Sequence, residues 1–83
     1  MKIRIKLYAS LGAYLPAGAK QNESDLDVAD GATPAGVIAK LGLPGDMCHL
    51  VLVNGLFCEP SARASQALQD GDALAIWPPV AGG

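Results

Sequence analysis

The stretch ALAIWPPVAGG, residues 73–83, guides the interpretation of the whole sequence. Residues 73–77 alternate along an apolar run, which is typical of a β-strand. A Pro-Pro pair follows and ends that strand, because proline has no N–H to donate to a sheet and its φ is fixed. Only a valine, an alanine and two glycines come after the prolines. We therefore expect a folded domain over residues 1–77 and a flexible tail over residues 78–83.

The tail has a size and composition that suit insertion into a narrow channel. Six extended residues reach roughly 20 Å, and the small side chains of Ala81 and Gly82 leave access where a larger residue would collide. The last residue, Gly83, carries the terminal carboxylate. These features favour the hypothesis that chemistry takes place on the Gly83 carboxylate inside the active site of another protein. A small-residue tail without a function is the alternative.

Length and composition restrict the class of protein. The chain has 83 residues, of which 51% are hydrophobic, so one domain with a compact core is expected. The net charge of −2 argues against a nucleic-acid-binding protein. No apolar run approaches membrane-spanning length, and the N-terminal residues do not resemble a signal peptide. Two cysteines are too few for a disulfide scaffold and are interpreted as free thiols, so we expect a cytoplasmic protein without a membrane partner.

The first third of the chain predicts a hairpin. Residues 2–8 alternate strictly between polar and apolar side chains, which indicates a half-buried strand. Residues 10–24 are loop-like, and residues 25–28 alternate again, so the two strands should pair in an antiparallel manner. The basic side chains of Lys2, Arg4 and Lys6 form either a solvated face or a docking surface for an acidic partner.

The middle of the chain predicts one short helix. Thr33 is a suitable N-cap, and Pro34 suits the first helical position. Apolar residues recur at helical spacing over residues 34–41, and Gly42 can adopt the left-handed conformation that ends many helices.

The last third predicts several short strands. Residues 50–53 and 56–58 should form a hairpin around Asn54-Gly55, and Asp70-Gly71 should turn the chain into a final strand over residues 72–77. This element order indicates an α+β fold in which one main helix packs across a mixed sheet. The crossover through the helix allows the last strand to lie parallel to the first.

Three aromatic residues are candidates for partner binding. Tyr8 and Trp77 fall on the outward register of their strands, and Phe57 lies on the predicted hairpin. If the first and last strands are neighbours, the three rings could form one exposed patch beside the tail. The alternative is that residues 10–24 fold over them.

Other sequence features argue against catalysis by this chain alone. Cys48, His49 and Cys58 supply at most three soft metal ligands, at no recognised zinc spacing, so we expect no metal site. The chain has one histidine, no clear nucleophile–base pair and no glycine-rich phosphate loop, so we expect a protein without a bound cofactor that is not itself an enzyme.

Three segments carry a resemblance to a known family. Residues 53–55 (VNG), 68–72 (LQDGD) and 77–83 (WPPVAGG) resemble the ThiS/MoaD group of ubiquitin-like sulfur carriers, and the likeness extends over the whole chain. The resemblance implies a ubiquitin-like β-grasp fold. Because of its Pro-Pro-Val-x-Gly-Gly ending, the chain is more similar to the small subunit of molybdopterin synthase than to the carrier of the thiazole pathway.

The resemblance also implies a function. An E1-like adenylyltransferase would use ATP to adenylate Gly83, and a sulfur donor would convert the adenylate to a thiocarboxylate. The acceptor would be a larger synthase subunit, either the molybdopterin synthase large subunit or thiazole synthase. The resemblance implies partner-binding roles for Tyr8, Phe57, Trp77, Pro78 and Pro79. A thiamine thiazole sulfur carrier and a non-carrier ubiquitin-like interaction module are the alternatives.

Overall fold

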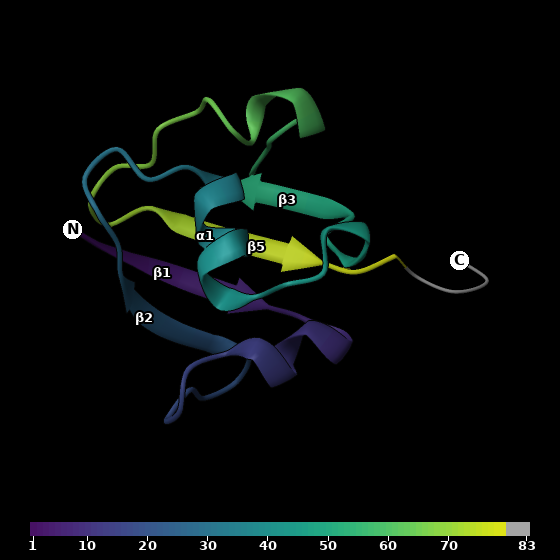
Figure 1. Ribbon diagram of the computed structural model, residues 1–83. Helices are drawn as coiled ribbons and strands as arrows, with labels where there is room; N and C mark the ends of the chain where they lie inside the picture. The colour runs from purple at the N-terminus through teal and green to yellow at the C-terminus, as the bar shows by residue number, and fades with distance from the viewer. Residues whose placement is uncertain (80–83) are drawn as a thin grey trace.

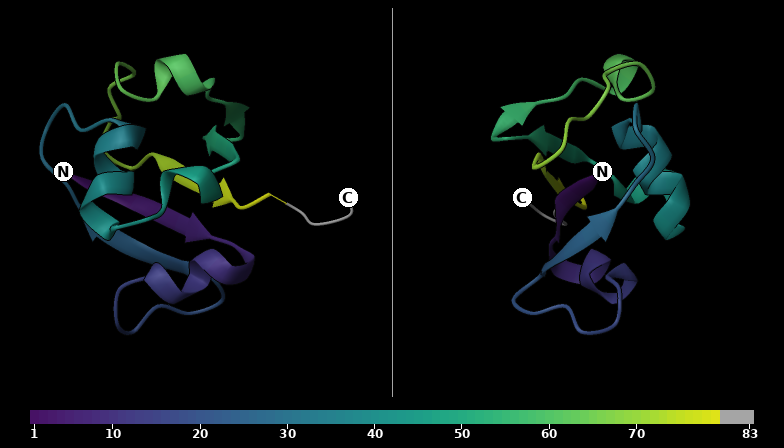
Figure 2. Two further views of the ribbon diagram at one scale, coloured as in Figure 1. Left: turned by 45° about the vertical axis from the view of Figure 1, so that its right-hand side comes forward. Right: turned by 90° about the vertical axis from the view of Figure 1, so that its left-hand side faces the viewer.

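The computed structural model describes residues 1–79, and its strands form one five-stranded sheet with the order β2-β1-β5-β3-β4 (Figure 1). The strands are β1 (Lys2–Leu7), β2 (Glu23–Asp27), β3 (Leu50–Val53), β4 (Leu56–Phe57) and β5 (Ala73–Trp77). The α-helix is α1 (Pro34–Leu41), and three 3-10 helices are η1 (Ala9–Tyr14), η2 (Gly45–Met47) and η3 (Pro60–Ala62). Figure 2 shows α1 on one face of the sheet. The predicted α+β architecture is confirmed.

The sheet is mixed, as the sequence predicted. β1 pairs with β2 in an antiparallel manner and with β5 in a parallel manner. β3 pairs antiparallel with both β5 and β4. The first and last strands of the chain therefore lie side by side in the middle of the sheet. Within residues 1–79, no helix combines the length and the apolar character needed to cross a membrane.

The core lies between the sheet and α1. It is formed by side chains that are at most 1% exposed, which include Ile3, Ile5, Leu7, Leu11, Val37, Val51, Leu74 and Ile76. α1 begins as predicted, because the Oγ1 atom of Thr33 accepts the N–H of Gly36 at 3.2 Å. It ends at Gly42, whose φ of 74° is left-handed.

The region predicted as a loop over residues 10–24 is more regular than its sequence suggested. Residues 9–14 form η1, and Leu11 from this 3-10 helix is buried in the core. A 3-10 helix this short leaves no helical repeat of apolar residues in the sequence, which is why the pattern read as a loop. Ala9 begins η1 with a φ of 52°, a conformation that is unfavourable for alanine.

The segments that carry the family resemblance hold the start of β5 in place. Asn54 and Gly55 have φ values of 52° and 82°, as a two-residue hairpin with a type I′ turn requires. The Oδ1 atom of Asn54 accepts the N–H of Ala73 at 2.9 Å, and its Nδ2 atom donates to Asp72 at 2.9 Å. On the other side, the N–H of Lys2 donates to Asp70 at 2.8 Å. These bonds connect β5 to both of its neighbours.

Candidate functional site

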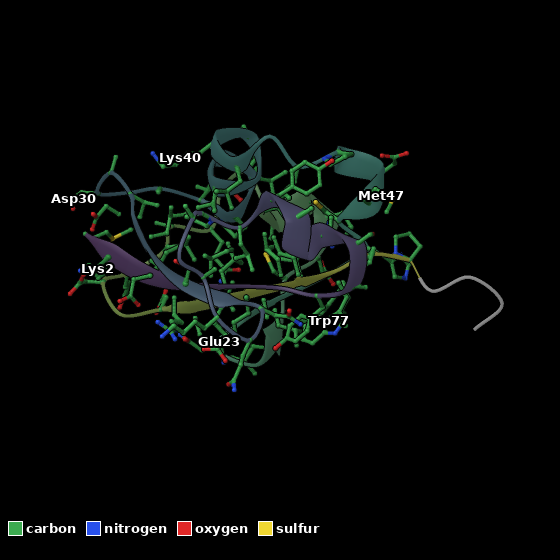
Figure 3. All side chains as sticks on the ribbon, turned by 90° about the horizontal axis from the view of Figure 1, so that it is seen from below. Lys2, Glu23, Asp30, Lys40, Met47 and Trp77 are labelled. Atoms are coloured by element: carbon green, nitrogen blue, oxygen red, sulfur yellow. The ribbon has the colours of Figure 1, made fainter. Side chains whose placement is uncertain are left out.

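An apolar patch lies on the face of the sheet opposite α1. Directly paired residues of neighbouring strands point to the same face, and the register pairs Leu50 with Trp77 and Leu52 with Phe57. Figure 3 shows Trp77 on the side of the sheet opposite Lys40, which lies on α1. We define the apolar patch as Tyr8, Leu50, Leu52, Phe57 and Trp77.

The aromatic residues of the patch are partly exposed. The rings of Tyr8 and Trp77 stack with their centroids 4.2 Å apart and an angle of 5° between their planes. Phe57 lies on the edge strand β4 and is 55% exposed, whereas Tyr8 and Trp77 are partly buried. The structure therefore brings Tyr8 and Trp77 together and places Phe57 across the sheet from them, with β3 between.

Sequence reasoning missed two members of the patch, Leu50 and Leu52. Residues 50–53 are all apolar, with no polar–apolar alternation, so the sequence alone does not indicate which of their side chains face outward. Both side chains are in fact only partly buried on the outer face. The available signal was the pairing implied by the Asn54-Gly55 turn, which sets the register of Leu52 against Phe57. Ala75, which pairs with Leu52, is on the same face but only 8% exposed, because a small side chain on an inner strand is shielded by its neighbours.

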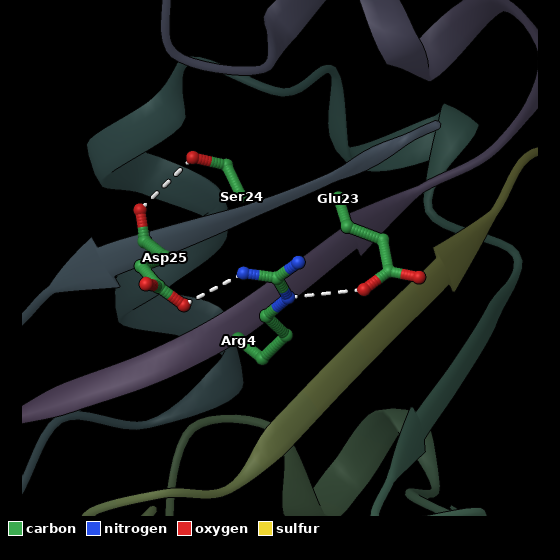
Figure 4. A network of polar contacts seen from close by, with 4 residues as sticks. All are labelled: Arg4, Glu23, Ser24 and Asp25. Atoms are coloured by element: carbon green, nitrogen blue, oxygen red, sulfur yellow. Dashed lines mark hydrogen bonds and ion pairs between the residues drawn. The ribbon is translucent and has the colours of Figure 1, made fainter. Parts of the chain in front are cut away.

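The other half of this face is charged but balanced. The register places Lys2 opposite Asp27, Arg4 opposite Asp25 and Lys6 opposite Glu23. The guanidinium of Arg4 donates from Nη1 to Asp25 at 2.8 Å and from Nε to Glu23 at 3.0 Å (Figure 4). The hydrogen bond to Asp25, followed by that to Glu23, raises the pKa of Arg4 above its ordinary value. The basic side chains of β1 thus face acidic partners, so a uniformly basic docking surface does not form.

The end of β5 is held on both sides by main-chain hydrogen bonds. The carbonyl of Ile76 accepts the N–H of Tyr8 at 3.2 Å, and the carbonyl of Trp77 accepts the N–H of His49 at 3.0 Å. Pro78 is buried and Pro79 is exposed. The apolar patch therefore adjoins the point at which the chain leaves the sheet. The predicted roles of Ala81, Gly82 and Gly83, and most of the predicted tail, lie outside the described residues.

The two cysteines are free thiols in the structure, as predicted. Cys48 is 4% exposed and Cys58 is 1% exposed. Burial raises the pKa of the Cys48 thiol above its ordinary value, against the opposing effect of Arg63. His49 is exposed. Among residues 1–79, no group of three or more His, Cys, Asp and Glu side chains is arranged to hold a metal ion.

Comparisons with known proteins agree with this architecture. The ThiS family matches residues 11–83. The structure resembles the Haloferax volcanii HVO 2177 protein with a TM-score of 0.76 and 30% identity, covering 100% of this chain and 87% of that one. It resembles SAMP1 from Haloferax volcanii with a TM-score of 0.71 and 27% identity, covering 100% of both chains. No match was found among curated proteins.

A third similar structure shows the fold alone. It is a chain from the complex of subunits 1 and 2 of molybdopterin-converting factor from Helicobacter pylori 26695, with a TM-score of 0.61, 16% identity and 100% of both chains covered.

The family match spans most of the sequence, and the mixed sheet with one main helix is the ubiquitin-like β-grasp. The chain therefore belongs to the ThiS family of ubiquitin-like sulfur carriers.

Proposed function

We propose that this protein carries sulfur as a C-terminal thiocarboxylate on Gly83. The observation that carries the proposal is the family match over residues 11–83, which extends through the Gly-Gly ending. The position of the apolar patch, directly beside the end of β5, supports it. A partner that covers the patch would receive the residues that follow Trp77.

The chemistry needs an activating enzyme, because a carboxylate is a poor electrophile. An oxygen of the Gly83 carboxylate would attack the α-phosphorus of ATP in an E1-like enzyme, forming an acyl-adenylate and releasing pyrophosphate. A sulfur nucleophile from a donor would then attack the carbonyl carbon, and AMP would leave with the bonding electron pair. Glycine at the last two positions places no side chain near the reacting carbon.

The proposed pathway is molybdopterin biosynthesis, in which a larger synthase subunit accepts the sulfur. The Pro-Pro-Val-x-Gly-Gly ending supports this assignment. The subunit 1–subunit 2 complex of the Helicobacter pylori factor has the same fold in one of its chains and provides a precedent for such a partner. A thiazole synthase is the alternative acceptor. Supplying the thiocarboxylate form to each acceptor with its precursor, and measuring product, distinguishes the two.

Intact mass spectrometry tests the carrier role. The protein is incubated with an E1-like enzyme, ATP and a sulfide source, and the expected mass change is the replacement of one oxygen by one sulfur. Deletion of Gly83 is the control and should show no change. An unchanged mass for the full chain, with an enzyme that modifies its own carrier in parallel, would contradict the proposal.

An alternative function is a ubiquitin-like module that only docks through the apolar patch. A single alanine appended after Gly83 separates the two functions, because it removes the reacting carboxylate from its position and leaves the patch unchanged. A carrier should lose sulfur transfer and keep partner binding. Sulfur transfer by the extended chain, without trimming of the added residue, would refute the carrier mechanism.

A further inference from the structure

Arg63 connects three segments of the main chain. It follows η3, and its guanidinium donates from Nη1 to the carbonyl of Cys48 at 2.8 Å, from Nη2 to that of His49 at 3.2 Å and from Nε to that of Cys58 at 3.3 Å. Its own carbonyl accepts the N–H of Ala35 in the first turn of α1 at 2.8 Å. Hydrogen bonds from an ionised donor are stronger than neutral ones, so this side chain fixes the main chain of Cys48 and His49, which directly precede β3.

One of these bonds acts directly on the base of the tail. The carbonyl of Cys48 and the N–H of His49 belong to the same peptide group. Arg63 holds the oxygen of this peptide, and the N–H donates to the carbonyl of Trp77 at 3.0 Å. Since the peptide is planar, holding its oxygen also sets the direction of its N–H. A charged donor on the oxygen also polarises the amide and strengthens the bond that its N–H makes.

The hydrogen bond from His49 to Trp77 lies at the end of the pairing between β3 and β5. Pro78 and Pro79 come next, and neither has an N–H that could continue the ladder. The carbonyl of Trp77 is therefore the last main-chain group of β5 before the prolines, and the bond from His49 fixes its position.

We propose that Arg63 is a positioning residue for the C-terminal carboxylate. Through the Cys48–His49 peptide it fixes the carbonyl of Trp77, and so aims the tail at the active site of a partner that is docked on the apolar patch. The proposal rests on the proposed carrier function. The side-chain hydrogen bonds of Arg63 go to carbonyls outside the apolar patch. Loss of the Arg63 side chain should therefore alter the aim of the tail and leave docking intact.

Arg63→Gln should therefore change kcat and not KM in the adenylation of Gly83. Weakening the hydrogen bond from His49 to Trp77, which is a bond of ordinary strength, predicts a kcat about fivefold lower, with KM constant within about twofold. Arg63→Lys keeps the charge but presents a single ammonium in place of the planar fork, so it should restore part of the lost kcat. Arg4→Gln is the matched control, because it removes a guanidinium that binds carboxylates of β2, away from the end of β5.

Amide hydrogen exchange measures the positioning without any partner. In Arg63→Gln, the His49 amide should exchange about fivefold faster, while the Leu7 amide, which donates to Asn22 between β1 and β2, should keep its rate. An unchanged His49 rate would overturn the proposal, as would faster exchange with unchanged kcat or an effect on KM alone. If Arg63→Gln does not fold, Arg63→Lys decides by the same two measurements. Absence of adenylation in the unmodified protein would refute the carrier function instead, and the exchange rates would still show whether Arg63 holds the base of the tail.

Discussion

Two neighbouring residues of β4 provide the sharpest test of the apolar patch. Phe57 is paired with Leu52 on the patch, and Leu56 is paired with Val53, whose side chain is buried on the opposite face. Leu56 is 74% exposed and Phe57 is 55% exposed. Exposure alone would thus make Leu56 the better contact for a partner, whereas the patch predicts that Phe57 contributes and Leu56 does not.

The expected size of the effect follows from the exposed area of Phe57. A phenylalanine ring that is about half exposed leaves roughly 100 Å² for a partner to cover, which is worth about 2.5 kcal/mol at ~25 cal/mol per Å². Phe57→Ala should therefore raise the Kd for the activating enzyme about sixtyfold. Because Phe57 lies on an edge strand, the substitution should lower the unfolding free energy of the protein by only about 1 kcal/mol, which lowers Tm by roughly 4–8 °C.

Titration calorimetry of each variant with the activating enzyme, combined with thermal unfolding followed by circular dichroism, separates binding from stability. Leu56→Ala should leave the Kd within about twofold of the unmodified protein. Ile76→Val is the opposite control, because Ile76 is fully buried, and it should lower stability by about 0.5–1.5 kcal/mol without affecting the Kd. Equal losses of affinity in Phe57→Ala and Leu56→Ala, or an unchanged Kd in Phe57→Ala, would refute the assignment of the patch.

Three further predictions concern strain, surface charge and a buried thiol. Ala9→Gly should raise Tm by a few degrees in thermal unfolding, since it relieves about 1–2 kcal/mol at a left-handed φ against an entropic cost of about 0.5–1 kcal/mol; a lower Tm would contradict the strain. Arg4→Gln should lower Tm slightly in dilute buffer, and the difference should vanish near roughly 1 M salt because exposed ion pairs are screened. Because burial raises the pKa of Cys48 in the folded state, this thiol ionises at a lower pH in the unfolded chain than in the folded one. Its contribution to the free energy of unfolding is therefore complete below about pH 8.5 and is lost as the pH rises above it. Urea unfolding at several pH values should show that Cys48→Ala reduces this alkaline loss, and an identical pH profile in the variant would exclude it.

Local patterns predicted most of the secondary structure. Alternation of apolar residues identified β1, β2 and β5, the Thr33-Pro34 pair identified the start of α1, and Asn54-Gly55 identified the hairpin. These signals are local, because capping and turn formation depend on residues a few positions apart. The same reasoning placed Tyr8 and Trp77 on the outward register of their strands and Phe57 on the hairpin, whereas their arrangement on one face depends on the strand order.

The features that sequence analysis missed depend on long-range contacts. Arg63 binds main-chain carbonyls, and any residue can supply a carbonyl, so nothing in the sequence identifies Cys48, His49 and Cys58 as its acceptors. Ala9 is similar, because its left-handed φ arises at a position where glycine would be expected. Both are connected to the end of β5 by hydrogen bonds of nearby residues. Tyr8, which precedes Ala9, donates to Ile76, and the peptide that Arg63 binds donates to Trp77.

The parallel pairing of β1 with β5 has a consequence for how this protein folds. The register joins Arg4 to Ala73, so the centre of the sheet forms only after nearly the whole chain has been brought together. Contacts between residues so distant in sequence slow folding, because loop closure must precede the gain from burial. A ribosome-bound chain without β5 would expose the inner edges of both β1 and β3 to other proteins. β5 is thus the strand that completes the sheet, so the residues that follow Trp77 leave an ordered sheet only after the first and last strands of the chain have paired.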